Sequence, residues 1–266
     1  MRTEPLVVDP ESRKRQGEFG SVKIVGIIPA RYASSRFQGK ALVDILGKPM
    51  VQRVYERAAR ANTLEAVIVA TDDQRIYDVV LGFGGQVVMT SPDCPTGTER
   101  VAIVAETLDC DVVANIQGDE PLLEPVVIDQ MIQPFLDDPS VEVSTLKQRV
   151  ENEVDYRDPN VVKVVTDLQG FALYFSRAST PGNLSNHWLQ THPNYRHVGL
   201  YAYRRERLLE FTQWERTPYE SAEGLEQLRF LEHGIRIRVV ETEHSLIGVD
   251  VPADLERVLE ILKSRG

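Results

Sequence analysis

The sequence predicts an α/β fold with a mainly parallel central sheet and a smaller mixed α/β subdomain. Two observations support this. Over residues 22–139, short β-branched apolar runs alternate with amphipathic helical stretches, which is the pattern of βαβ units. After residue 139, the apolar runs alternate more with polar residues and are separated by turn signals such as Asp158-Pro159-Asn160, which indicates mixed or antiparallel pairing.

The first half is expected to form four strands, over residues 22–29 (VKIVGIIP), 66–70 (AVIVA), 86–89 and 111–116 (DVVANI), with a helix over residues 50–61 after the first strand. The long runs lack alternation, which is typical of strands buried on both faces of a parallel sheet. Ligands of such sheets bind outside the carboxyl ends of the strands, so the polar segments that follow them are the candidate site.

The second half is expected to form strands at VEVSTL, NVVKVVTD, FALYFS, HVGLYAYR and IRIRVVET, and helices over residues 204–211 and 222–233. Residues 1–21 are predicted to be a flexible N-terminal tail, because their few apolar residues recur at neither helical nor strand period. Residues 22–266 are predicted to form one domain with two halves, at about 22–139 and 140–266.

Composition excludes several classes of protein. The chain has 30 Lys and Arg against 40 Asp and Glu, a formal net charge of −10, which argues against broad binding of nucleic acid. Two cysteines without a CxxC pair argue against a zinc module or a disulfide scaffold. No apolar run approaches the length of a membrane span or a secretory signal, so a cytoplasmic location is expected.

The loop after the first strand, ARYASSRFQGK, is the first candidate binding segment. Its small residues let backbone N–H groups approach an anion, and Arg31, Arg36 and Lys40 supply three positive charges that suit a triphosphate. The loop matches neither the P-loop nor the dinucleotide-binding glycine pattern, which argues against an NAD-type oxidoreductase.

Carboxylates at two other places suit a magnesium ion. Asp119 follows the DVVANI strand beside Gly118, and Asp250 ends an apolar stretch near the C-terminus. Mg²⁺ prefers oxygen ligands shared between protein and substrate phosphates. The alternative for Asp119 is capping of the next helix, and Asp254 is most simply a residue of a helix's first turn.

Two further segments are candidates for nucleotide binding. Thr71 and Asp72 come directly after the predicted strand AVIVA, and Thr96-Gly97-Thr98 comes directly before a helical stretch. Backbone and hydroxyl groups of Gly97 and Thr98 can recognise a base edge, although the same residues form an ordinary helix cap.

Nine segments, in order from Lys23 to the C-terminus, carry a family resemblance: IIPARYASSRFQGK, VIVATDD, TGTERVA, NIQGDEP, NVVKVV, YFSRA, HVGLYAYRRERLLEF, GLEQLRFLEHG and IGVDVPADLERV. The chain resembles the 3-deoxy-manno-octulosonate cytidylyltransferases, or CMP-Kdo synthetases. The resemblance implies a glycosyltransferase-A-like nucleotidyltransferase, usually a homodimer, that uses CTP, Kdo and Mg²⁺ to make CMP-Kdo and pyrophosphate for lipopolysaccharide synthesis. The first half would then bind nucleotide, and the second half would bind the acceptor and dimerise.

The resemblance also implies roles for residues at matching positions. The triphosphate would be held by Ala30, Arg31, Arg36 and Lys40; Thr71 and Asp72 would lie near the nucleotide; and Gly97 and Thr98 would recognise cytosine. Asp119 and Asp250 would hold magnesium and, with Arg31 and Lys40, form the catalytic set. Residues for the sugar acid would be Gln117, Arg177, His197, Tyr201, Glu226 and Gln227.

The sequence departs from the family pattern in two places. Phe37-Gln38 and Ala41 stand where Leu-Pro and Pro are common, and Ala178-Ser179-Thr180 follows Arg177 where Ile-Pro is usual. Because the second departure falls among acceptor residues, two alternatives stay open. One is transfer of CMP to another acidic acceptor, such as an amino-Kdo, a sialic-acid-like sugar or a phosphonate, and the other is an inactive nucleotide-binding regulatory module.

Overall fold

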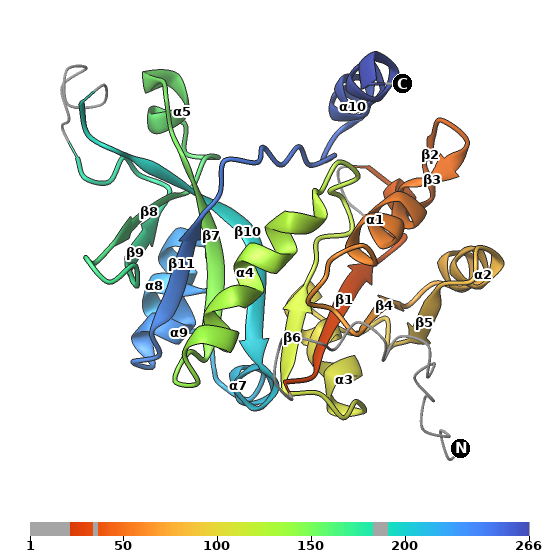
Figure 1. The fold of residues 1–266 in the computed structure, drawn as a ribbon, viewed down its shortest axis with the longest axis horizontal. Helices are drawn as coiled ribbons and strands as arrows, with labels where there is room; N and C mark the ends of the chain where they lie inside the picture. Colours follow the sequence, from red (N-terminus) through yellow and green to blue (C-terminus); the bar gives the residue numbers. More distant parts are fainter. Residues whose placement is uncertain (1–21, 34–36, 183–190, 266) are drawn as a thin grey trace. The chain divides into compact units, whose positions relative to one another are not determined.

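The computed structural model describes residues 22–33, 37–182 and 191–265 (Figure 1). The chain divides into two compact units. Unit 1 contains the described residues up to Asp129 together with the C-terminal segment from Leu246, and unit 2 contains Gln130–Ser245. The predicted N-terminal tail and Arg36 lie outside the described residues.

Unit 1 is built on four parallel strands in the order β6, β1, β4, β5, with bounds Val112–Asn115, Ile24–Ala30, Ala66–Thr71 and Gln86–Met89. Neighbouring residues such as Ile27 and Ile28 are both fully buried, which confirms that β1 is covered on both faces. Its remaining elements are η2 (Lys40–Leu42), β2 (Asp44–Ile45), β3 (Lys48–Pro49), α1 (Met50–Ala58), α2 (Gln74–Gly82), α3 (Gly97–Glu106) and α10 (Pro252–Arg265). Helix α4 (Pro125–Asp137) begins in unit 1 and ends in unit 2.

The C-terminal segment packs with the beginning of the chain. Val249 and Val258 join Ile45, Met50 and Leu122 in one buried apolar cluster. Phe37, one of the departures from the family pattern, packs against this cluster from the first loop. Burial of these apolar side chains therefore ties α10, and Asp250 just before it, to the loop that follows β1.

Unit 2 has mixed strand pairing, as its alternating pattern predicts. Its strands are β7 (Val143–Arg149), β8 (Lys163–Thr166), β9 (Ala172–Ser176), β10 (Tyr195–Arg204) and β11 (Ile237–Glu241). Strand β7 pairs parallel with β11 and antiparallel with β10, while β8 pairs antiparallel with β9 and β10. Its helices, besides the end of α4, are α5 (Glu153–Arg157), α7 (Arg205–Phe211), α8 (Pro218–Glu223) and α9 (Leu228–Glu232).

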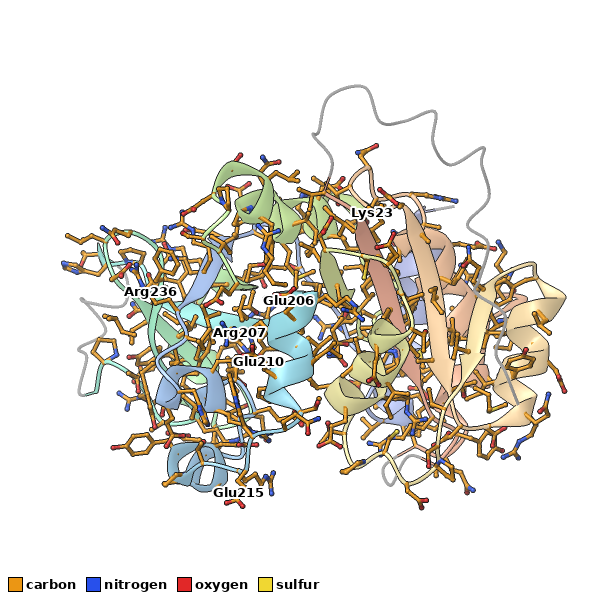
Figure 2. The ribbon with its side chains drawn as sticks, turned by 90° about the horizontal axis from the view of Figure 1, so that it is seen from below. Lys23, Glu206, Arg207, Glu210, Glu215 and Arg236 are labelled. Carbon is orange, nitrogen blue, oxygen red and sulfur yellow. The ribbon has the colours of Figure 1, made fainter. Side chains whose placement is uncertain are left out.

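The apolar face of α7 belongs to the core of unit 2. Leu208 and Phe211 are buried, and the Phe211 ring stacks on Phe230 of unit 2. Glu206 and Glu210, labelled with Arg207 in Figure 2, are exposed, and Arg207 pairs with Glu142 and Glu210. Among the described residues, no helix combines the length and apolar character needed to cross a bilayer.

A buried ion pair ties α8 to α9. The Arg229 guanidinium donates through Nε and Nη2 to the two carboxylate oxygens of Glu220, at 2.7 and 2.6 Å, and Glu220 has no exposed surface. We expect Glu220→Gln to lower the free energy of unfolding by about 3–5 kcal/mol, because the buried Arg229 guanidinium would lose the carboxylate charge to which it makes two hydrogen bonds. Denaturant unfolding measures this, with the exposed pair partner Glu153→Gln as control, for which we expect about 0–1 kcal/mol.

The same pair makes stability depend on pH. Burial raises the pKa of Glu220, but hydrogen bonds from Arg229 and the Thr217 backbone outweigh it and hold that pKa below its ordinary value. The stabilisation is therefore complete above the unfolded-state pKa and is lost as the pH falls through the lower folded-state pKa. Unfolding free energies measured across the acid range should fall less steeply in Glu220→Gln, and parallel curves for the two proteins would contradict this.

Candidate active site

The loop after β1 is closed by Gly39, which places Lys40 at the start of η2. Gly39 has φ 72°, and its N–H donates to the Tyr32 carbonyl at 2.9 Å. A side chain at this position would be strained, and its Cβ would lie 3.1 Å from the Tyr32 ring. The sequence therefore uses glycine here to bring the loop back toward the end of β1.

Lys40 contacts both carboxylates that the sequence analysis assigns to magnesium. Its Nζ lies 2.7 Å from Asp119 Oδ2 and 3.5 Å from Asp250 Oδ1. The Val249 N–H donates to the Asp119 carbonyl at 2.9 Å, which brings the two segments together. Asp254 accepts hydrogen bonds from the Asp250 and Val251 N–H groups at 2.8 and 2.9 Å, so it fixes the backbone at the start of α10.

These residues open into a pocket of about 450 Å³, a size typical of small-molecule sites. The pocket lies among the carboxyl ends of the unit 1 strands, as the position of their polar loops predicts. It is lined by Pro29, Ala30, Arg31, Ala33, Lys40, Ala41, Gly97, Arg100, Gln117, Gly118, Asp119 and Asp250. It thus gathers seven of the predicted site residues, drawn from four separate segments of the chain.

Arg100 is a pocket residue that the sequence analysis did not select. Its side chain is 1% exposed and donates through Nη2 to Asp72 at 2.7 Å and through Nη1 to Thr90. The available signal was a cation in the first turn of α3, where the helix dipole disfavours positive charge. Asp72 is thereby linked to the pocket through Arg100.

The other nucleotide candidates are buried beside the pocket. Thr71 is fully buried, and its Oγ1 accepts the Asp73 N–H at 3.2 Å. Thr98 lies in the first turn of α3 and is 9% exposed, while Thr96 caps the helix by accepting the Glu99 N–H. The capping interpretation of this segment is thus confirmed, and Gly97 still faces the pocket.

Gly118 shows how closely two segments approach at the pocket. A Cβ on Gly118 would lie 2.9 Å from the Pro29 carbonyl oxygen, so β1 or the loop after β6 would have to move. We expect Gly118→Ala to lower the free energy of unfolding by about 1–3 kcal/mol and to reduce activity. Gly82→Ala is the matched control, because nothing lies within 4 Å of its Cβ. Equal unfolding midpoints and rates for the two variants would contradict the expectation.

The carboxylates fit a magnesium ion that shares ligands with a substrate. Both contact the same ammonium group, so their oxygens converge on one cationic position. Within the described ranges, no group of three or more His, Cys, Asp or Glu side chains is arranged to hold a metal ion. Mg²⁺ is commonly bound by one or two carboxylates, with phosphate oxygens and water completing its shell.

In unit 2, His197 lies on β10, the strand that pairs with β7 and β8. Its Nε2 is 2.9 Å from Thr145 Oγ1, and its ring packs against Phe175 and Tyr201. Thr145 Oγ1 also lies 2.7 Å from the Leu200 carbonyl and 3.2 Å from the Val198 carbonyl. Because carbonyls only accept, we assign the hydroxyl proton to a carbonyl, which makes Nε2 the protonated ring nitrogen and Nδ1 an acceptor. Burial lowers the pKa of His197 to about 3, so the imidazole is neutral.

The Tyr201 ring lies 5.3 Å from the His197 ring, and Glu226 is close enough to Tyr201 to affect its pKa. Gln227 follows Glu226 in the chain. Burial, with Tyr203 and Glu226 nearby, raises the pKa of Tyr201 well above its ordinary value, so the phenol stays protonated. Gln227 is 5% exposed, and its Nε2 has no hydrogen-bond partner in the described part of the chain. A buried N–H donor without an acceptor costs free energy. A ligand oxygen that accepts from Gln227 would remove this cost.

The helix predicted over residues 222–233 is two helices, and this changes the setting of Glu226. Gly224, with φ 65°, ends α8, and α9 begins at Leu228. Glu226 therefore lies in the connection between the helices and Gln227 is the N-cap of α9, whereas the sequence analysis placed both on one helix.

Arg177 follows β9 and is held by its neighbours. Its Nε donates to the Glu223 carbonyl at 2.8 Å and its Nη1 to the Pro159 carbonyl at 3.2 Å. The guanidinium is partly exposed. Of the predicted acceptor residues, unit 2 contains these five, and Gln117 lies in the unit 1 pocket.

Comparisons with known proteins point to one family. Residues 25–237 match the family model described as cytidylyltransferase. The 3-deoxy-manno-octulosonate cytidylyltransferase of Geotalea uraniireducens is 56% identical over 91% of this chain and 100% of its own length. The enzyme of the same name from Geobacter sulfurreducens is 55% identical over the same shares.

Solved structures give the same result. A CMP:2-keto-3-deoxy-manno-octonic acid synthetase complexed with CTP has a TM-score of 0.87 and 42% identity, over 92% of this chain and 100% of that one. A Leptospira borgpetersenii cytidylyltransferase, with a TM-score of 0.63 and 17% identity over 92% and 88%, shares the fold. The nucleotidyltransferase fold is thus confirmed, and the chain belongs to the 3-deoxy-manno-octulosonate cytidylyltransferase family.

Proposed function

We propose that this chain transfers CMP from CTP to the anomeric hydroxyl of 3-deoxy-D-manno-octulosonate (Kdo), which gives CMP-Kdo and pyrophosphate for lipopolysaccharide synthesis. The observation that carries the proposal is the contact of Lys40 with both Asp119 and Asp250 in a pocket also lined by Arg31 and Gly97. The 3-deoxy-manno-octulosonate cytidylyltransferases that are 56% and 55% identical over 91% of the chain support the choice of substrates.

The reaction joins the anomeric oxygen of Kdo to the α-phosphorus of CTP and breaks the bond from that phosphorus to the bridging oxygen of the pyrophosphate. The proton of the anomeric hydroxyl is released to water, and the bonding electrons leave with the pyrophosphate. Such transfers need alignment and cations more than covalent help from the protein. Arg31 and Lys40 would hold the triphosphate, and Lys40 would neutralise charge on the departing pyrophosphate. Gly97 and Thr98 would orient the cytosine, and Arg100 would hold Asp72 in place.

We propose Mg²⁺ as the cofactor, held by Asp119 and Asp250. The ion supplies Lewis-acid stabilisation of phosphate charge and lowers the pKa of a bound hydroxyl. Its positive charge would compete with Lys40 for the same two carboxylates, which frees the ammonium to bind phosphate oxygens. No group of three or more His, Cys, Asp or Glu side chains surrounds a metal position in the described residues, so two carboxylates would leave coordination positions for the substrate.

On the acceptor side, Arg177 suits the Kdo carboxylate because its planar guanidinium pairs with a carboxylate through two parallel hydrogen bonds. His197 would accept a hydrogen bond from a sugar hydroxyl at Nδ1. Tyr201 and Gln227 would donate hydrogen bonds to sugar oxygens. Gln117 and Glu226 complete the proposed set. Neutral His197 and Tyr201 serve as hydrogen-bonding groups that orient the sugar without adding charge near the attacking oxygen.

Pyrophosphate release tests the proposal. We expect release that requires CTP, Kdo and Mg²⁺ together, with no comparable rate from ATP, GTP or UTP. An amino-Kdo, a sialic acid and a phosphonate serve as alternative acceptors. Faster release with one of them would transfer the function to that acceptor, and binding of CTP without release for any acceptor would indicate the regulatory module.

We also propose that the enzyme is a cytoplasmic homodimer. The resemblance to the family supports dimerisation, and CTP is a nucleotide of the cytoplasm. The apolar face of α7 is covered within unit 2, so α7 would not form the interface through Leu208 and Phe211. Strand β9 pairs only with β8 in the described chain, and Leu173 on it is 62% exposed, which makes this edge the better candidate. Sedimentation of a monomer at micromolar concentration would contradict the dimer.

A further inference from the structure

Lys163, the first residue of β8, carries a charge inside unit 2. The residue has no exposed surface, and its ammonium donates to the backbone carbonyls of Asp158, Val161 and Arg177 at 2.8, 2.6 and 2.8 Å. These three bonds use every N–H of the group. Burying an ammonium is costly, so an apolar side chain would serve a strand interior better if packing alone were needed.

Glu223, the last residue of α8, contacts Arg177, whose carbonyl is bound by Lys163. Its Oε2 accepts the Arg177 N–H at 2.9 Å, and its Oε1 accepts the Ser176 hydroxyl at 2.7 Å. Its backbone carbonyl accepts Arg177 Nε at 2.8 Å. Arg177 is therefore fixed at its N–H and at Nε by Glu223, and at its carbonyl by Lys163.

Lys163 and the Glu223 carboxylate hold the backbone of Arg177, and the Glu223 carbonyl holds its guanidinium. An arginine side chain has several rotatable bonds, and ordering it when a ligand binds costs free energy. With Nε on one carbonyl and Nη1 on another, the plane of the guanidinium is set before any ligand arrives. Such preorganisation raises affinity for a planar carboxylate without adding a contact to it.

We propose that Lys163 and Glu223 are positioning residues for Arg177, which fix its guanidinium in the orientation that binds the carboxylate of the acceptor sugar. The inference rests on the proposed function, in which Arg177 contacts that carboxylate. Lys163 does not touch the acceptor, so its effect appears in acceptor binding and leaves CTP binding unchanged.

The test is the KM for each substrate in Lys163→Met. We expect the KM for Kdo to rise about tenfold, which corresponds to about 1.4 kcal/mol of lost binding, with the KM for CTP unchanged. Glu223→Gln should give a smaller rise, because it keeps the backbone carbonyl that accepts Arg177 Nε and leaves one side-chain oxygen for the Arg177 N–H and the Ser176 hydroxyl. Lys147→Met is the matched control, because Lys147 is also buried in unit 2 but contacts Tyr195 and Thr166. It should keep the KM for Kdo, and its unfolding midpoint shows that the variant is folded.

Chemical rescue separates positioning from stability. Lys163→Ala removes the atoms from Cγ to Nζ, and n-propylammonium has the same carbon and nitrogen atoms and the same three N–H donors. The amine should restore the KM for Kdo, whereas 1-propanol, which is uncharged and has one donor, should not. If Lys163→Ala does not fold, Glu223→Gln carries the test by the same comparison of KM values.

Three results would overturn the inference. They are a folded Lys163→Met with the native KM for Kdo, an equal rise in Lys147→Met, or a KM for CTP that rises in parallel. Arg177→Lys is assayed alongside to separate the two proposals. If it raises the KM for Kdo and Lys163→Met does not, only the positioning inference is wrong. If neither variant changes it, Arg177 is not an acceptor residue and both proposals fail.

Discussion

Replacing Asp119 by Asn is expected to lower kcat by about 10²–10³-fold at saturating CTP and Kdo, because a cation that stabilises transition-state charge would lose one of its two carboxylates. The change removes one negative charge and keeps the shape of the side chain. It also removes the ion pair with Lys40 at 2.7 Å, while Asp250 stays at 3.5 Å from the same ammonium. Raising the Mg²⁺ concentration should restore only part of the rate.

The measurement is the initial rate of pyrophosphate release against Mg²⁺ concentration for Asp119→Asn and the native chain. Asp78→Asn is the control, since Asp78 lies exposed on α2 and accepts a hydrogen bond from the Gln74 side chain at 2.7 Å, away from the pocket. It should have the native rate and Mg²⁺ dependence. Native turnover in Asp119→Asn at saturating Mg²⁺ would show that this carboxylate does not hold the ion.

Replacing Arg177 by Lys is expected to lower kcat/KM for Kdo by about 10²-fold and to leave the KM for CTP unchanged. The reason is that one ammonium cannot reproduce the two parallel hydrogen bonds of a guanidinium to a carboxylate. The positive charge is retained, so a purely electrostatic role would show a much smaller loss. The loss should shrink for an acceptor analogue in which the carboxylate is replaced by a hydroxymethyl group.

Steady-state kinetics with each substrate varied in turn measures this effect. Arg157→Ala is the control, because Arg157 on α5 is exposed and pairs only with Glu153 in the described chain, an interaction worth little. An equal loss of kcat/KM for CTP in Arg177→Lys would contradict the assignment of Arg177 to the acceptor. Native kinetics with Kdo would contradict it as well.

The fold of unit 1 could be predicted because three of its strands, β1, β4 and β6, are buried on both faces. Runs such as VKIVGIIP and DVVANI contain consecutive apolar residues with no polar face, and this pattern has few structural solutions other than a covered parallel strand. The helix boundaries in unit 2 were harder. Gly224 and the N-cap at Gln227 divide the apolar periodicity of residues 222–233, and periodicity alone does not report a left-handed residue.

The pocket could be predicted in outline because the carboxyl ends of parallel strands meet at one edge. Lys40, Asp119 and Asp250 were expected together, although 131 residues separate the last two in sequence. Arg100 was missed because its partners, Thr90 and Asp72, come from other loops, and local spacing does not show them. Lys163 was missed for a similar reason, since backbone carbonyls that receive a buried ammonium leave no sequence pattern.

The most direct test of the central claim is NMR of the reaction product made from CTP, Mg²⁺ and Kdo labelled with ¹³C at its anomeric carbon. The proposal predicts a new anomeric ¹³C signal split by coupling to a single ³¹P nucleus, together with one equivalent of pyrophosphate. This result would identify the phosphodiester bond of CMP-Kdo. An unchanged Kdo spectrum while CTP is consumed, or coupling to phosphorus at another carbon, would contradict cytidylyl transfer to the anomeric hydroxyl.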